Sequence, residues 1–257
     1  RFEKEWKEII PRTGRWIDMD GAYKTMDSSY TESVWWSFKN LYDKGLVYQS
    51  FKPMHLCPHC ETTLSNFEVN QGYKDITDLA VTVELELINR PNTYFLAWTT
   101  TPWTLPGNVA LAVNTDIEYA EVTGEVEGNT YILASSRVQE VFGENYKVLK
   151  KISGKDLVGE RYKTLFDYYQ KEGEVFSGDF VTAEEGTGIV HIAPAFGEDD
   201  YNLSLKNKLP LIQHVGMDGR FKPEVTDFAG ESVKSKDDPQ ATDVKIIKYL
   251  ATKDRLF

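Results

Sequence analysis

Apolar and polar residues alternate along residues 79–87, which predicts a half-buried β-strand. The apolar positions are Leu79, Val81, Val83, Leu85 and Leu87, and the polar residues between them are Thr82, Glu84 and Glu86. Further short strands are expected at residues 93–99, 109–113, 117–123, 130–134, 146–151, 175–182, 187–193 and 211–215. Asp218-Gly219 is typical of a hairpin turn. Many short strands separated by turn residues favour a β-barrel or a sandwich.

Helical periodicity replaces this alternation in the first 50 residues. Apolar residues recur there at helical intervals, at Val34, Trp35, Phe38, Leu41 and Tyr42. Ser29 and Glu32 have capping-box spacing, and Gly45 fits the position just past the helix end. We expect Trp35, Trp36 and Phe38 to pack in a core, as large aromatic side chains usually do.

Three more helices are predicted further along the chain. The first runs from about Ser135 to Phe142 and is closed by Gly143, and the second runs from about Glu198 to Asn207. The third begins near Asp238-Pro239, a cap residue followed by proline at the first helical position. Its apolar face includes Val244, Ile247 and Leu250.

These elements predict an α+β chain in three parts. Residues 1–76 form a small helical base that contains a C-x-x-C metal knuckle, residues 77–237 form a β-barrel-rich domain with peripheral helices, and residues 238–257 form a C-terminal helix. The chain has 257 residues, which is enough for one large domain or two small ones. Because it starts at Arg1 and stops at Phe257, just after the last predicted helix, we expect it to be a fragment of a longer protein.

The composition of the chain argues against several classes of function. No apolar run approaches the roughly 18 residues that a membrane span needs, and no signal-peptide pattern opens the chain. The formal net charge of −11 argues against a general nucleic-acid-binding surface, although local lysines could still hold an RNA end. Two cysteines in C-x-x-C spacing indicate a reducing compartment, so we expect a cytoplasmic protein.

Two polar segments are the candidates for chemistry. The run WTTTPWTLPGN, residues 98–108, places four threonines and an asparagine beside two tryptophans, and its prolines stiffen the backbone. The run GTGIVHIAPAFGEDDY, residues 186–201, supplies His191 and a carboxylate cluster that ends at Asp200. Together they indicate a pocket for an amine-bearing polar group, without the serine or cysteine nucleophile and partner base of a covalent hydrolase.

These segments and several others resemble the editing insertion, connective peptide 1, of isoleucyl-tRNA synthetase, a class I aminoacyl-tRNA synthetase. The other matching motifs, in the order of the family, are GRWIDMD at 14–20, ESVWWSFKNLYDKGLVY at 32–48, CPHCETTLSNFEVNQGYKD at 57–75 and LVGERYKTLFDYY at 157–169. Valyl and leucyl relatives typically carry arginine where this chain has Thr101, and they typically lack a histidine at the position of His191. Both differences favour the isoleucyl branch.

The resemblance assigns roles to individual residues. It implies that Asp200 binds the α-ammonium group of the substrate and that Thr101 orients the attacking water. The remaining residues that it places in the pocket are Trp98, Thr99, Thr100 and Thr104 in the wall and Asn108 as polar support of the loop or the terminal adenosine. Alternatively, Asp200 is only an exposed carboxylate at a helix start, and the threonines only reflect strand propensity.

His191 is the specificity residue that the resemblance implies. It lies in the apolar run IVHIA, where a lone histidine is usually a hydrogen-bonded core residue. As a pocket wall, its ring would leave room for a valine side chain and collide with the extra methyl of isoleucine. Steric exclusion of the larger group can discriminate strongly, and the isoleucine–valine pair is itself the standard example of such double-sieve editing.

Cys57 and Cys60 form a knuckle that could supply two of the four thiolates of a structural zinc site. By resemblance, the other two ligands come from a second C-x-x-C outside this chain. A free dithiol is the alternative, and His55 and His59 are too close in sequence to complete good tetrahedral geometry. The editing reaction itself needs no cofactor.

The resemblance therefore implies a proofreading enzyme that hydrolyses mischarged Val-tRNA(Ile) with an activated water. Its partners are the 3′ acceptor end of tRNA(Ile) carrying valine and the rest of the synthetase, and we expect a monomer with no membrane contact. The HIGH and KMSKS signatures of ATP-dependent ligation are absent from the sequence, so ligation of isoleucine belongs to the parent enzyme. The alternatives are an acceptor-end binding module that is inactive without its parent, a valyl-tRNA synthetase editing domain and a free-standing editing protein.

Overall fold

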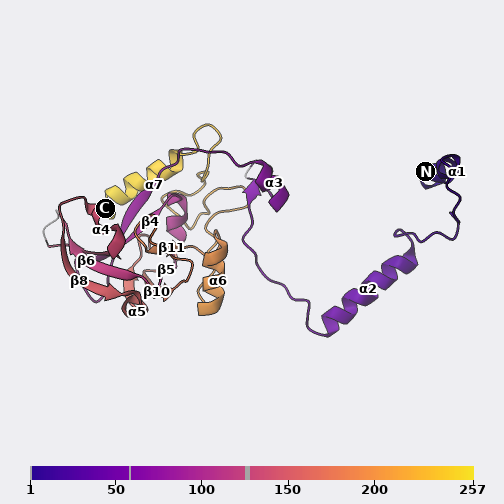
Figure 1. Cartoon of the computed structure of the whole chain (residues 1–257). Coiled ribbons are helices and arrows are strands. Elements are labelled where there is room, and N and C mark those ends of the chain that lie inside the picture. The colour runs from indigo at the N-terminus through magenta and orange to yellow at the C-terminus, as the bar shows by residue number, and fades with distance from the viewer. Residues whose placement is uncertain (1, 58, 125–127) are drawn as a thin grey trace. The chain divides into compact units, whose positions relative to one another are not determined.

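The computed structural model describes residues 2–57, 59–124 and 128–257. The chain divides into two compact units, Arg1–Phe51 and Lys52–Phe257 (Figure 1). Among the described residues, no helix combines the length and the apolar composition that crossing a bilayer requires.

The first unit contains helices α1 (Phe2–Arg12) and α2 (Ser28–Asp43), and the periodicity at residues 34–42 predicted the second of them. The expected capping box of Ser29 and Glu32 is wrong, because α2 begins two residues earlier, after Asp27. The prediction at the other end is confirmed. Gly45 has a φ of +70° and its N–H donates to the carbonyl of Tyr42, a left-handed helix stop that favours glycine.

The expected core packing of the α2 aromatics is also wrong for this chain. No residue of α2 is buried, and Trp35, Trp36 and Phe38 expose 73 %, 69 % and 56 % of their surface. The residue types favour burial, but burial requires a packing partner, and no described residue of this first unit covers these three rings.

The second unit begins with a two-stranded hairpin, β1 (Leu56–Cys57) and β2 (Thr62–Thr63), followed by helix α3 (Asn66–Gln71). A capping box occurs here, at Ser65 and Glu68, where each side chain bonds the backbone N–H of the other residue. This hairpin carries Cys57 and Cys60.

The larger sheet has five strands in the order β3-β4-β7-β6-β8. Its strands are β3 (Val81–Glu86), β4 (Thr93–Thr99), β7 (Thr130–Ala134), β6 (Glu118–Thr123) and β8 (Lys147–Ser153). The strand predicted from alternation is confirmed, and Val81, Val83 and Leu85 face the core. Glu84 is buried on the opposite face.

The smaller sheet has four strands in the order β11-β5-β10-β9, namely β11 (Val190–Ile192), β5 (Ala110–Val113), β10 (Glu172–Ser177) and β9 (Arg161–Lys163). The prediction of a mixed α and β chain is confirmed, but the prediction of a closed barrel is wrong. The two sheets stay open, and among the described residues an isolated bridge between Leu87 and Tyr162 links an edge of one sheet to an edge of the other. Residues 211–215 are not a strand either, since only Val215 forms a bridge, with Phe221 across the turn at Gly219.

Short and long helices surround the sheets. They are η1 (Pro102–Gly107), η2 (Ser135–Arg137), α4 (Val138–Phe142), α5 (Gly154–Leu157), α6 (Glu198–Asn207) and α7 (Ala241–Ala251). The predicted bounds of α6 are confirmed. Helix α7 starts two residues after the predicted Asp238-Pro239, and the Asp238 carboxylate accepts the N–H of Gln240 in the turn that precedes the helix.

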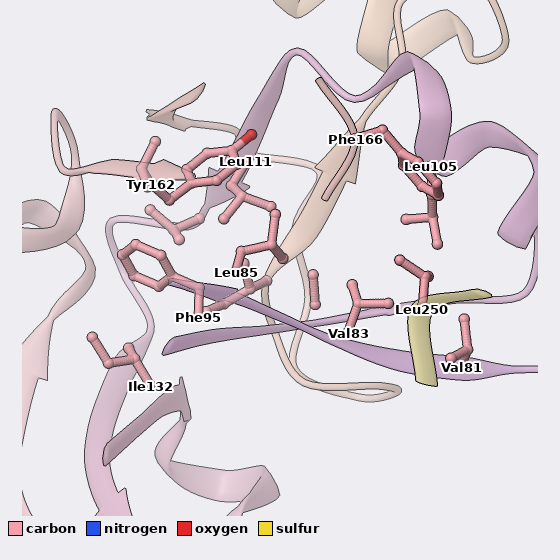
Figure 2. Close-up of a cluster of buried hydrophobic side chains, with 14 of the residues drawn as sticks. Val81, Val83, Leu85, Phe95, Leu105, Leu111, Ile132, Tyr162, Phe166 and Leu250 are labelled. Carbon is pink, nitrogen blue, oxygen red and sulfur yellow. The ribbon is translucent and has the colours of Figure 1, made fainter. Parts of the chain in front are cut away.

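The main core lies where the two sheets meet α7. Val83 and Phe95 from the larger sheet, Leu111 and Tyr162 from the smaller sheet, and Leu250 from α7 share one buried cluster (Figure 2). The C-terminal helix is therefore part of the same packed body as the segments that carry the polar motifs.

Candidate active site

The threonine-rich motif forms the end of β4 and the 3₁₀ helix η1. Pro102 occupies the first helical position, where its fixed φ and missing N–H are tolerated, and the N–H of Thr104 bonds the carbonyl of Thr101 at 2.9 Å. This tight turn gathers three hydroxyls. The Oγ1 of Thr101 lies 3.2 Å from that of Thr99 and 3.3 Å from that of Thr104.

His191 joins these hydroxyls from the smaller sheet. It lies on β11 opposite Leu111 of β5, and its Nε2 is 2.8 Å from the Oγ1 of Thr104, although the two residues are 87 positions apart. Its Nδ1 is 3.1 Å from the Nδ2 of Asn108. The structure thus brings together five of the predicted site residues, namely Thr99, Thr101, Thr104, Asn108 and His191.

The hydrogen bonds of Asn108 determine the tautomer of His191. The Asn108 Oδ1 accepts from the hydroxyl of Tyr162 at 2.6 Å, and its Nδ2 donates to the carbonyl of Ala110 at 2.9 Å. The amide nitrogen therefore also donates to the Nδ1 of His191, which leaves the proton on Nε2. The Nε2–H then donates to Thr104, whose own hydroxyl donates to the carbonyl of Thr101 at 2.8 Å.

His191 is neutral in this environment. Burial and, to a smaller extent, the neighbouring His214 lower its pKa to about 3. Both ring nitrogens are engaged in hydrogen bonds. The ring is consequently a fixed, uncharged wall rather than a proton acceptor at neutral pH.

Asp200 differs from the acidic residues beside it. Glu198 and Asp199 are exposed at the start of α6, whereas Asp200 is half-buried and its Oδ1 accepts the N–H of Ala193 at 2.7 Å. Ala193 follows His191 by two residues, so the carboxylate is tied to the segment that carries the imidazole. Burial raises the pKa of Asp200 above its usual range.

Two of the predicted wall residues lie outside the hydrogen-bonded network. Trp98 precedes Thr99 on β4, so its side chain projects to the opposite face of the strand, where its ring lies against Gly186. Thr100 is exposed. Neither residue bonds the five clustered side chains in the part of the chain that the structure describes.

Sequence reasoning missed three residues that support the site. Tyr162 orients Asn108, His214 contacts the backbone of Trp103 through a 3.0 Å interaction with its carbonyl, and Asp243 accepts the N–H of Trp103 at 3.0 Å. A usable sequence signal existed only for Asp243. It is spaced as a member of the apolar face of α7, three residues before the buried Ile246, and a carboxylate at such a position requires a partner.

The C-x-x-C knuckle holds two free cysteines. Backbone N–H groups of Cys60 and His59 lower the pKa of the Cys57 thiol, while the Cys57 sulfur raises the pKa of Cys60. Within residues 2–57, 59–124 and 128–257, no group of three or more histidine, cysteine or acidic side chains is placed to hold a metal. A zinc site at Cys57 and Cys60 thus remains a prediction that depends on ligands from elsewhere.

The sequence model of the family described as tRNA synthetases class I (I, L, M and V) matches residues 1–252. The chain belongs to the class I tRNA synthetases. Its relatives include the isoleucine–tRNA ligase of Bdellovibrio bacteriovorus, with 45 % identity over 95 % of this chain and 24 % of that protein. The cytoplasmic isoleucine–tRNA ligase of Saccharomyces cerevisiae is 44 % identical over 99 % of this chain and 24 % of its own length.

This class I synthetase chain thus spans about a quarter of the length of the relatives that it matches. The family resemblance inferred from its motifs is confirmed. Among solved structures, it is similar to GlLeuRS-CP1, with a TM-score of 0.46 and 21 % identity over 50 % of this chain and 58 % of that one.

The close approach of Gly107 to His214 in this synthetase chain predicts a stability defect. A Cβ added to Gly107 would lie 2.2 Å from the Nδ1 of the fully buried His214. We expect Gly107→Ala to lower the free energy of unfolding by about 1–3 kcal/mol, as overpacking of a core does. Urea unfolding measures this loss. Gly72→Ala is the control, because its nearest contact would be an ordinary 3.5 Å, and equal stability of the two variants would contradict the prediction.

The two buried histidines predict a loss of stability in acid. Burial lowers the pKa of His191 to about 3 and that of His214 to about 4, from an ordinary 6.5. The unfolded chain therefore binds protons below pH 6.5 that the folded chain does not, and each histidine removes up to about 1.4 kcal/mol per pH unit as the pH falls from 6.5 towards 4. Urea unfolding at pH 5, 6 and 7 measures the slope.

Glu84 opposes this trend and supplies the control. Burial raises its pKa to about 7, so its contribution is lost as the pH rises from 4.5 towards 7. In a Glu84→Gln variant the fall in stability from pH 7 to pH 5 should therefore be steeper than in the wild type. A flat or reversed dependence in that variant would refute the neutral, buried state of the two histidines.

Proposed function

We propose that this chain is the editing module of an isoleucyl-tRNA synthetase, which hydrolyses valine esterified to the 3′ end of tRNA(Ile). One observation carries the proposal. The hydroxyls of Thr99, Thr101 and Thr104 form a single hydrogen-bonded network with His191 and Asn108, across two motifs far apart in sequence. Family membership and the isoleucine–tRNA ligase relatives support the same substrate class.

The network suits hydrolysis of an ester that is already activated. Such a reaction needs an oriented water and stabilisation of the developing oxyanion, and it does not require a protein nucleophile. The Thr104 hydroxyl already uses its proton in a hydrogen bond to the Thr101 carbonyl, and it also accepts a hydrogen bond from His191. The hydroxyl of Thr101 makes only long contacts, of 3.2 and 3.3 Å, so it is the group that can turn to an incoming water.

His191 supplies selectivity rather than proton transfer in this proposal. Its low pKa and its two engaged nitrogens make it a weak base, whereas its locked ring presents a wall of constant shape. A valine side chain fits beside this wall, and the longer isoleucine side chain collides with it. The cognate ester is thereby protected from hydrolysis.

Asp200 anchors the substrate. An aminoacyl ester carries an α-ammonium group at neutral pH, and a half-buried carboxylate is a strong partner for it. The bond from the N–H of Ala193 holds one carboxylate oxygen and leaves the other for the ligand. The ammonium contact would fix the ester relative to the wall formed by His191.

The partners follow from the charge and the length of the chain. A net charge of −11 disfavours independent binding of tRNA, so we propose that the rest of the synthetase supplies most of the contacts that bind the acceptor end. We propose that this longer protein ligates isoleucine to tRNA(Ile) with ATP, that it acts as a monomer, and that it completes a zinc site at Cys57 and Cys60.

Deacylation of purified Val-tRNA(Ile) by this chain tests the proposal. We expect hydrolysis above the spontaneous rate, and we expect Thr101→Val, which removes the hydroxyl at nearly constant volume, to abolish most of it. Thr63→Val is the control, because Thr63 is exposed on β2. A chain that binds the acceptor end without hydrolysing the ester is instead a binding module, and unchanged hydrolysis by Thr101→Val would show that the site lies elsewhere.

A further inference from the structure

The N-terminus of η1 is not capped by the side chain of the residue that precedes it, Thr101. The first N–H groups of a helix have no partner within the helix, and a threonine at the position before the helix usually accepts one of them through its side chain. Thr101 occupies that position, yet it makes no such side-chain bond. Because Pro102 lacks an N–H, the donor that needs a partner is the N–H of Trp103.

Asp243, which is 140 residues away in the sequence, caps η1 instead. Its Oδ1 accepts the Trp103 N–H at 3.0 Å. The Thr101 hydroxyl is therefore not needed as a cap, and it points instead to Thr99 and Thr104 in the proposed catalytic network. Thr101, which occupies the usual capping position, can thus use its hydroxyl in the proposed catalytic network.

The cap is held firmly in place. Asp243 is completely buried, its Oδ2 is 2.7 Å from the Nζ of Lys234, and Lys234 also reaches the carboxylate of Asp78 at 3.1 Å. Helix α7, which carries Asp243, contributes Leu250 to the main core. The neighbouring carbonyl of Trp103 is held as well, by the Nε2 of His214 at 3.0 Å.

We propose that Asp243 is a positioning residue, which caps η1 in place of Thr101 and so keeps the Thr101 hydroxyl available to the substrate water. The inference rests on the proposed function for its catalytic consequence but not for its structural part. Without the Asp243 acceptor, the Thr101 hydroxyl would rotate to bond the Trp103 N–H and leave the site. A displacement of about 1 Å can cost about a hundredfold in rate.

The test compares asparagine and alanine at position 243 in a Lys234→Met background. Both double variants lack the ion pair, and only the asparagine variant keeps a side-chain oxygen that can accept the Trp103 N–H. With Val-tRNA(Ile), we expect kcat of the alanine variant to be about tenfold or more below that of the asparagine variant, with KM similar. Equal kcat values in two folded variants would overturn the proposal.

Thr101→Val supplies a second arm. If loss of the cap acts by withdrawing the Thr101 hydroxyl, adding Thr101→Val to the alanine variant should lower kcat no further, because the two changes remove the same group. A multiplicative loss would show that Asp243 acts on catalysis by another route and would overturn the assigned role.

Hydrogen exchange of the Trp103 amide tests the cap without a measurement of catalysis. We expect slow exchange in the wild type and in the asparagine variant, and faster exchange in the alanine variant. If the wild-type chain does not hydrolyse Val-tRNA(Ile) but this exchange pattern holds, the proposed function fails and the tertiary cap stands. Equal exchange in the asparagine and alanine variants would reject the cap itself.

Discussion

Replacing Asp200 by asparagine is expected to slow hydrolysis of Val-tRNA(Ile) by about a hundredfold. Loss of one member of a buried, hydrogen-bonded charge pair costs about 2–5 kcal/mol, and here the lost partner is the carboxylate that holds the α-ammonium group of the substrate. Asparagine keeps an oxygen for the N–H of Ala193, so the backbone at the end of β11 should stay in place. Single-turnover deacylation measures the effect.

Two neighbouring residues give the control for this experiment. Glu198 and Asp199 are exposed carboxylates on the same turn of α6, and their conversion to the corresponding amides should leave the rate within a factor of about two. Because burial raises the pKa of Asp200, the wild-type rate should also fall as acid protonates this group, and Asp200→Asn should lack that dependence. Unchanged hydrolysis by Asp200→Asn would remove Asp200 from the site.

Replacing His191 by alanine should make the cognate ester a substrate. Removal of the ring opens space for the extra methylene of isoleucine, and one methylene in a pocket is worth about 10- to 200-fold in discrimination, isoleucine and valine being a standard example of this rule. We expect the ratio of Ile-tRNA(Ile) to Val-tRNA(Ile) hydrolysis to rise by about that factor. Parallel deacylation assays with the two charged tRNAs measure the ratio.

The ratio also separates a steric role from simple damage to the fold. His191 bonds Thr104 and Asn108, so its removal takes one hydrogen bond from each of these two buried polar groups and should lower the hydrolysis of both esters if the site collapses. A gain for the isoleucyl ester, with the valyl ester still hydrolysed, is specific to the loss of the wall. Continued protection of Ile-tRNA(Ile) in a folded variant would contradict the role proposed for His191.

Much of the second unit could be predicted from local patterns. Strict alternation at residues 79–87 located β3, and the helix expected from about Glu198 to Asn207 is α6. Such patterns succeed because a strand or a helix must place its own apolar side chains on one face, whatever it packs against. The two polar motifs were likewise visible as clusters of hydroxyl, amide and imidazole groups before any contact between them was known.

Prediction from the sequence failed for features that depend on contacts with a distant segment of the chain. Trp35 and Trp36 look like core residues by type, but no described residue of their own unit covers them. Closure of the sheets was also beyond local reasoning, because it depends on which edge strands pair. The edges β3 and β9 meet at the bridge of Leu87 and Tyr162, and no pairing of the edges β8 and β11 is found among the described residues.

By itself, the sequence determined many of the strands and helices, the family and the two motifs that carry the chemistry, because these are properties of neighbouring residues and of residue types in fixed order. Only the tertiary structure decided how the motifs work together. It set the tautomer of His191 through Tyr162 and Asn108, and it placed Asp243 at the N–H of Trp103. Buried polar groups take whichever partner the packed core brings to them, and no local pattern specifies that partner.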